Sequence, residues 1–315
     1  MATMRPPFRA PRATLDDPRA GRMLPAASVA LVLALVLVII LDPGRSAVQA
    51  SSVFGGLRAA GEPAFIAGHR GDRAGAPENT IPALQAALDS SMDFVETDIQ
   101  LSADGVPVLI HDVTVDRTTN GTGAVADLTL AQLQSLDAGS WYSTDFADTR
   151  IPTFAAFLEI LAESDKKALL ELKGFWTADE ARLVTDLVHD YWVQDRVTFA
   201  SVDFTTLDNI GEVGPSFGRA IIRRDLPRDP VGLATHFGAI AIITTPKSLE
   251  ENPDAVEEMH RAGLGLIVYT LNSERRWSDA VALGVDGIVT DRPSLLDEWL
   301  AATAPETSAR VRLGG

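Results

Sequence analysis

The 315-residue sequence contains no cysteine. This absence excludes disulfide bonds, catalytic thiols, zinc–thiolate sites and a lipid-modified cysteine as a membrane anchor. Without covalent cross-links, the folded part of the chain must be stabilised by its hydrophobic core. The chain is long enough to bury a core of substantial size.

Basic residues are scarce in most of the chain. The sequence has 27 Lys and Arg against 43 Asp and Glu, for a formal net charge of −16. The first fifty residues hold six of the Arg and three of the Asp, so the remainder has 21 basic and 40 acidic residues and a net charge of −19. So acidic a body is unsuited to binding nucleic acid. Any phosphate that it binds must be held locally, by a metal ion or by a few well-placed cations.

A long uncharged stretch, residues 23–41, lies near the N-terminus. Its 19 residues are enough to cross a bilayer as a helix. The arginines before it are Arg5, Arg9, Arg12, Arg19 and Arg22, whereas only Arg45 follows closely. This asymmetry predicts a single-pass protein of the cell membrane, with residues 1–22 in the cytoplasm and the rest outside. The alternative is a cleaved signal peptide and a secreted protein, because Val48-Gln49-Ala50 resembles a signal-peptidase site.

The rest of the chain reads as one large domain. Residues 42–63 are rich in Gly, Ser and Pro and are expected to be a linker, residues 64–302 to be the domain, and residues 303–315 to be a flexible tail. Strands are expected at residues 65–68, 94–100, 107–111, 168–173, 197–201, 219–222, 239–243, 266–270 and 287–290. Helices are expected at residues 80–90, 130–136, 154–163, 178–191, 204–213, 254–262, 275–282 and 293–301.

This alternation of short strands and longer helices indicates repeated βα units and a parallel sheet. About eight units over roughly 240 residues favour a closed TIM-type (β/α)8 barrel over an open doubly wound sheet. Residues 112–153 break the alternation with turn-forming runs. They are expected either to shape the site at one rim of the barrel or to be an ordinary long loop.

Acidic side chains occur where two of the expected strands end. Glu96 and Asp98 are two residues apart on one strand, so they point to the same face. Glu171 lies at the end of another apolar strand. Because the C-terminal ends of barrel strands form the active-site rim, we expect these carboxylates to meet there. Three oxygen ligands suit one hard divalent cation, Mg²⁺ or Ca²⁺.

Histidines and cations follow the same strand ends. His69 and His111 each come just after an expected strand, where a general acid and base belong. The remaining histidines, His189, His236 and His260, fall in expected helices or loops and are interpreted as structural. Arg70 can contact two phosphate oxygens at once, and Lys173 can act as a point charge. We therefore expect a phosphoryl-transfer site at this rim.

Eight motifs in a fixed order extend this interpretation. They are His69-Arg70-Gly71, Pro77-Glu78-Asn79-Thr80, Glu96-Thr97-Asp98, Asp104-Gly105-Val106-Pro107-Val108 with His111-Asp112, Asp116-Arg117-Thr118-Thr119-Asn120-Gly121-Thr122-Gly123, Ile151-Pro152-Thr153, Glu171-Leu172-Lys173 and Gly284-Val285-Asp286-Gly287-Ile288-Val289-Thr290-Asp291-Arg292-Pro293. In this order they resemble the glycerophosphodiester phosphodiesterase family, over about residues 64 to 300. Each motif alone is weakly specific, but the ordered set is highly specific.

The resemblance implies a TIM barrel with a small insertion after the second strand. It implies His69 and His111 as the acid–base pair, Glu96, Asp98 and Glu171 as metal ligands, and Arg70 and Lys173 as phosphate-binding residues. The implied reaction is hydrolysis of glycerophosphodiesters to glycerol 3-phosphate and an alcohol through a cyclic phosphate.

Three further residues are candidates for the walls of the pocket. Asn79 belongs to the second of the ordered motifs, and Trp176 lies just after Lys173, where a core or surface position is equally compatible with the sequence. Tyr269 stands where many family members have Trp, so an aromatic wall is retained.

Two other functions remain open at this point. A phospholipase that acts on intact membrane lipids, like the sphingomyelinase D relatives, would share the barrel, although the sequence shows no obvious apolar run near the rim. A non-catalytic phosphate-binding domain would have lost a histidine or an acid, and here none is missing.

Overall fold

The structure is a computed structural model that describes residues 48–303. Nine strands of the described chain form one sheet. They are β1 (Phe65–Gly68), β2 (Phe94–Leu101), β3 (Pro107–Leu109), β4 (Lys167–Leu172), β5 (Val197–Ser201), β6 (Gly218–Ile222), β7 (Ala241–Thr244), β8 (Gly265–Val268) and β9 (Gly287–Thr290). All except β3 pair in parallel, and β1 pairs with both β9 and β2, which closes the sheet. The expected eight-stranded parallel barrel is thus confirmed. Strand β3 pairs antiparallel with β2 and adds an edge outside the barrel.

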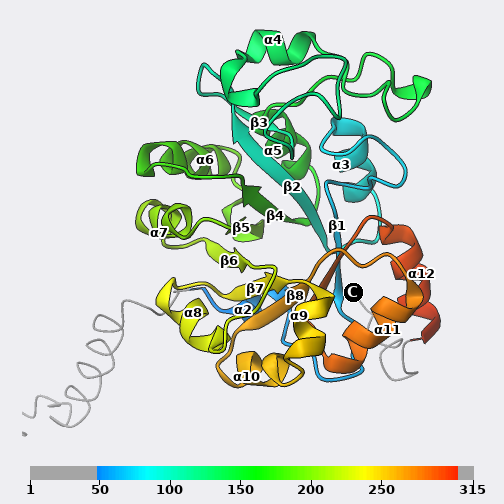
Figure 1. Cartoon of the computed structure of the whole chain (residues 1–315), viewed down its shortest axis with the longest axis vertical. Coiled ribbons are helices and arrows are strands. Elements are labelled where there is room, and N and C mark those ends of the chain that lie inside the picture. The colour runs from blue at the N-terminus through cyan, green and yellow to red at the C-terminus, as the bar shows by residue number, and fades with distance from the viewer. Residues whose placement is uncertain (1–47, 304–315) are drawn as a thin grey trace, which may run out of the picture. The chain divides into compact units, whose positions relative to one another are not determined.

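Helices surround the barrel (Figure 1). They are α3 (Ile81–Leu88), α5 (Phe154–Ala162), α6 (Ala178–Asp190), α7 (Phe204–Val213), α8 (Pro230–His236), α9 (Pro246–Glu251), α10 (Ala255–Arg261), α11 (Glu274–Leu283) and α12 (Pro293–Thr303). Threonine side chains cap several of them; Thr177 forms a reciprocal capping box with Glu180 at the start of α6. Helices α8 and α9 were not expected, because each has under two turns and too few apolar positions to show a helical period.

The strands place alternate residues in two different cores. Along β2, Val95 and Ile99 face outward and join the core between the strands and the helices. Phe94 faces inward and belongs to a second core inside the barrel. Because side chains alternate along a strand, Glu96 and Asp98 share the inward face with Phe94. The sequence of β2 therefore directs both carboxylates into the barrel.

The N-terminal end of the barrel is closed by a short helix within the segment expected as a linker. Helix α2 spans Ala50–Phe54, and both of its terminal side chains are buried. The ring centroid of Phe54 lies 5.2 Å from that of Phe65 and 6.2 Å from that of Phe94. Since Phe65 and Phe94 begin β1 and β2, α2 covers the end of the barrel from which the strands start. A few apolar residues among Gly and Ser thus form part of the domain.

An excursion between β3 and α5 contains helix α4 (Leu130–Ser135) and the 3₁₀ turns η1 (Val125–Asp127) and η2 (Thr144–Phe146). It has a small core of its own, formed by Val108, Ile110, Val115, Val125, Leu133, Ala138 and Ile151. The Tyr142 hydroxyl donates a hydrogen bond to the Ala74 carbonyl, in the loop that follows β1. The excursion therefore reaches across to the rim where the first barrel strand ends.

The expected membrane span at residues 23–41 and residues 304–315 of the expected tail lie outside the described part of the chain. Among residues 48–303, no helix combines the length and apolar composition that a bilayer crossing requires.

Candidate active site

Three carboxylates converge at the C-terminal end of the barrel. Asp98 and Glu171 are register partners on the adjacent strands β2 and β4, and Glu96 shares the inward face of β2. One oxygen from each of these carboxylates lies within 4.8 Å of the other two. Burial raises the pKa of Glu96 well above its ordinary value, and the charges of Asp98 and Glu171 raise it further. Ionisation of Glu96 is therefore opposed both by its burial and by the neighbouring acids.

Two cations lie against this cluster. Lys173 Nζ is 2.8 Å from Glu171 Oε1 and 3.5 Å from Asp98 Oδ1. Arg70 donates its backbone N–H to Glu96 Oε2 at 2.8 Å. The buried Nε of Arg70 makes no hydrogen bond to the described residues, although it lies 3.4 Å from Asp98 Oδ2. Burial opposes ionisation of Asp98, but Lys173 and Arg70 outweigh it and lower the pKa of Asp98.

The loop after β1 has an unusual backbone that places Arg70. Arg70 and Gly71 both have positive φ, at 57° and 83°. A Cβ on Gly71 would lie 2.6 Å from the backbone of Ala83, so only glycine fits between this loop and α3. The Gly71 N–H in turn donates to the Glu96 carbonyl at 3.1 Å. The His-Arg-Gly sequence thus folds the guanidinium back over the carboxylate cluster.

Each of the two candidate histidines is held by a carboxylate. His69 Nδ1 lies 2.6 Å from Asp291 Oδ1, and His111 Nδ1 lies 2.7 Å from Asp112 Oδ1. In both pairs the carboxylate accepts from Nδ1–H, which leaves Nε2 for proton transfer. Burial lowers the pKa of His69 despite the opposing effect of Asp291.

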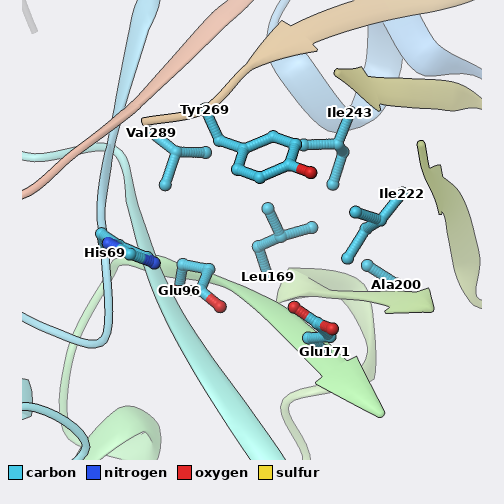
Figure 2. Close-up of a pocket in the computed structure, with 9 residues that line it drawn as sticks. All are labelled: His69, Glu96, Leu169, Glu171, Ala200, Ile222, Ile243, Tyr269 and Val289. Atoms are coloured by element: carbon cyan, nitrogen blue, oxygen red, sulfur yellow. The ribbon is translucent and has the colours of Figure 1, made fainter. Parts of the chain in front are cut away.

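A pocket of about 350 Å³ opens beside these groups. Figure 2 shows His69 and Glu96 on one side, with Ala200, Ile222 and Ile243 on the other. Leu169, Val289, Glu171 and Tyr269 complete the lining. The Tyr269 ring extends across the pocket toward Ile243. The pocket is therefore lined by both polar and apolar side chains.

The other candidate residues lie behind or away from this pocket. Asn79 donates to Asp98 Oδ2 at 2.9 Å and accepts from Thr97 Oγ1 at 2.7 Å, so it supports a ligand of the cluster. Trp176, a candidate pocket wall, is instead 1% exposed in the outer core, where its Nε1 donates to the Lys173 carbonyl. Large apolar surface favours that buried position.

The three histidines interpreted as structural lie elsewhere among the described residues. His189 contacts the Phe217 ring, His236 contacts the Phe237 ring, and His260 bonds to Asp286. None of them lines the pocket of Figure 2.

Five charged residues of the site had no assigned role in the sequence. Asp112 and Asp291 orient the histidines, and Glu78, Arg73 and Arg117 connect these aspartates to each other. All except Arg73 lie in the ordered motifs, which could have indicated their importance but not their partners.

The barrel domain is similar in sequence to proteins of one known family. A profile of the glycerophosphoryl diester phosphodiesterase family matches residues 69–295. A glycerophosphodiester phosphodiesterase of Caldanaerobacter subterraneus subsp. tengcongensis is 32% identical over 235 residues, which cover 74% of this chain and 96% of the relative.

Two solved structures are similar in fold. An Oleispira antarctica phosphodiesterase in complex with the product sn-glycerol-3-phosphate has a TM-score of 0.72 at 26% identity, over 75% of this chain and 96% of that one. A glycerophosphodiester phosphodiesterase from Agrobacterium tumefaciens has a TM-score of 0.66 at 30% identity, over 75% of this chain and 100% of that one. The residues matched by the family profile include every site residue described above.

Proposed function

Because the chain belongs to the glycerophosphoryl diester phosphodiesterase family and is therefore a phosphodiesterase, we propose that it releases glycerol 3-phosphate and an alcohol by acid–base catalysis between His69 and His111. The observation that carries this proposal is the pair of aspartate-bound histidines beside one carboxylate cluster. The product named for the Oleispira antarctica relative supports glycerol 3-phosphate as the product here.

The carboxylate cluster fits a divalent cation. Its three oxygens are close together, and the raised pKa values of Glu96 and Glu171 follow from burial and mutual repulsion, which a cation would relieve. Oxygen ligands suit Mg²⁺ or Ca²⁺. Glu96, Asp98 and Glu171 would hold one such ion, which would stabilise negative charge on the phosphate oxygens.

The chain's own residues account for the proton transfers. Arg70 and Lys173 bind the phosphate, and Nε2 of one histidine removes the proton of the glycerol 2-hydroxyl. That oxygen attacks phosphorus while the other histidine protonates the departing alcohol, leaving a cyclic phosphate. Water then opens the ring with the two proton transfers reversed.

An internal nucleophile suits this pocket. Among the described residues that line it there is no Ser or Thr, and the chain has no Cys. Attack by a hydroxyl already tethered to the phosphate gains roughly 7–11 kcal/mol over an untethered nucleophile when well oriented.

The test is a 2-deoxy analogue of a glycerophosphodiester, which keeps the phosphate and the alcohol but lacks the internal nucleophile. We expect competitive inhibition with very slow turnover. Cleavage at the normal rate would contradict internal attack.

Histidine variants test the acid–base pair separately. His69→Ala and His111→Ala should each lower kcat by about a hundredfold or more. His189→Ala, which removes a ring that packs on Phe217 and does not line the pocket, is the matched control. Equal losses in all three variants would contradict the assignment.

A second candidate function is action on intact lipids. Three large apolar side chains that come just after strands are exposed: Val113 is 74%, Phe175 62% and Val202 51% exposed. They follow β3, β4 and β5; β4 carries Glu171, and Ala200 of β5 is the register partner of Glu171. Exposed apolar side chains that follow strand ends can contact acyl chains.

The two functions separate in a paired assay of liposomes and a soluble diester. If lipid is a substrate, Phe175→Ser should lower liposome hydrolysis several-fold and leave soluble-diester hydrolysis unchanged. No hydrolysis of liposomes by the wild type would remove this candidate.

A further inference from the structure

A single buried glutamate connects the two halves of the site. Glu78 lies in the loop before α3 and is 5% exposed. Its carboxylate receives Arg70 Nη1 at 2.5 Å, Arg73 Nη2 at 2.9 Å, and Arg117 Nη2 and Nη1 at 2.7 and 3.0 Å. Three guanidinium groups therefore share one carboxylate as their common partner.

Two of these arginines continue to the histidines. Arg73 Nη1 lies 3.5 Å from Asp291 Oδ1, the oxygen that holds His69. On the other side, Arg117 Nε and Nη2 lie 2.6 and 3.1 Å from the two oxygens of Asp112, which holds His111. Alternating charges thus run without a break in the order His69, Asp291, Arg73, Glu78, Arg117, Asp112, His111.

Neither Asp291 nor Asp112 can replace Glu78 at the centre of this charge network. Without the Glu78 charge, three guanidinium groups would face one another with no anion between them, and like charges at such distances repel. Arg73 and Arg117 would then no longer be fixed in position, and their contacts with Asp291 and Asp112 would be weakened. Burial opposes ionisation of Glu78, but Arg117 and Arg70 outweigh it and lower the pKa of Glu78, so the charge is present at neutral pH.

We propose that Glu78 is a positioning residue that sets the orientation of both histidines at once, through the Arg73–Asp291 arm and the Arg117–Asp112 arm. This inference rests on the proposed function, since it assumes that His69 and His111 transfer the protons. Glu78 itself touches neither histidine among the contacts described, and its effect is transmitted by the two arginines.

The experiment combines kinetics with ring-¹⁵N histidine NMR on the full-length chain. Glu78→Gln keeps the shape but removes the charge. We expect kcat to fall about 10- to 100-fold, the usual loss when a supporting hydrogen-bond partner is removed. The ring-nitrogen signals of both His69 and His111 should shift.

Asp286→Asn is the matched control. Asp286 is also a fully buried carboxylate with several partners, but it bonds to His260, Arg58 N–H and Leu266 N–H away from the pocket lining. This variant should shift the His260 signal and lower thermal stability. It should leave kcat and the signals of His69 and His111 unchanged.

Unchanged histidine signals in a folded Glu78→Gln protein, or a loss of activity that matches only the loss of folded protein, would overturn the inference. If Glu78→Gln does not fold, Arg73→Lys and Arg117→Lys decide. The first should shift only His69 and the second only His111; any other pattern overturns the proposal. Should His69→Ala and His111→Ala stay active, the proposed function fails instead.

Discussion

Replacing Glu96 should have opposite effects on stability with and without metal. The carboxylate oxygens of Glu96, Asp98 and Glu171 lie within 4.8 Å of one another. At an effective dielectric constant of about 20, two unit charges at that distance repel by about 3.5 kcal/mol. Glu96 takes part in two such pairs, so at this distance Glu96→Gln removes about 7 kcal/mol of repulsion before any offset by nearby cations.

Arg70 and Lys173 offset much of this repulsion, because both lie against the cluster. In the presence of a chelator we therefore expect Glu96→Gln to gain about 1–3 kcal/mol, the usual size of a single-site effect. For a domain of this size that is a rise in Tm of roughly 2–12 °C. The amide oxygen can still accept the Arg70 N–H, so the loop after β1 keeps its bond.

Metal should reverse the order. An ion at a thousandfold its Kd stabilises the wild type by about 4.1 kcal/mol, which exceeds the gain expected for the variant in chelator, and the amide binds a hard ion more weakly. The order of the two Tm values should therefore reverse: the variant should have the higher Tm in chelator, and the wild type should have the higher Tm in Mg²⁺ or Ca²⁺. Activity should be lost on chelation and return with the ion.

The dependence on pH has a defined sign. Burial and the neighbouring acids raise the pKa of Glu96, so its cost to the metal-free fold is present above the folded-state pKa and is relieved as pH falls toward the ordinary value. The advantage of Glu96→Gln in chelator should therefore be larger at pH 8 than at pH 5. The exposed Glu250→Gln, which loses a surface pair with Arg276, is the control. A folded Glu96→Gln protein that melts below the wild type in chelator would refute the reasoning.

Three further outcomes are expected. Asp291→Asn removes a group that raises the pKa of His69 against burial, so the acid limb of kcat/KM against pH should move to lower pH. The value of kcat should fall about 10- to 100-fold. If the acid limb does not move, titration of His69 is not its cause. Phe54→Ala should cost about 3–5 kcal/mol of stability, read as a lower Tm, with kcat unchanged because Phe54 lies at the far end of the barrel. If residues 23–41 span the membrane, the chain should stay in the pellet at alkaline pH and be cut by protease added to intact cells; a soluble exported protein beginning at Ser51 would indicate signal cleavage instead.

The fold was predictable from the sequence because its elements have strong local patterns. Strands such as β5 and β9 are short apolar runs with clear boundaries, and α7 has a complete amphipathic period. Helices α8 and α9 have too few turns for a period to show. Helix α2 could not be predicted for another reason. It packs on the barrel through the contact of Phe54 with Phe65 and Phe94, and no local sequence pattern indicates such a tertiary contact.

The candidate site shows the same division. Glu96 and Asp98 could be placed together because strand alternation determines which way both point. The Glu78 network could not, because its contacts join residues that are 8 and 39 positions apart through long arginine side chains. Trp176 was expected as a possible wall from its nearness to Lys173 in sequence, but adjacency in sequence does not determine which side of a strand end a ring packs against.

Helix α2 also determines how the molecule can be handled. The described chain starts at the end of the barrel where β1 and β2 begin, whereas the carboxylates, the histidines and the pocket lie where the strands end. A tag, a fused protein or a solid support joined just before Ala50 would thus be attached at the face opposite the pocket. Immobilised enzyme should turn over soluble diester as fast as free enzyme, which makes the N-terminal side the natural point of attachment for a biosensor or a flow reactor.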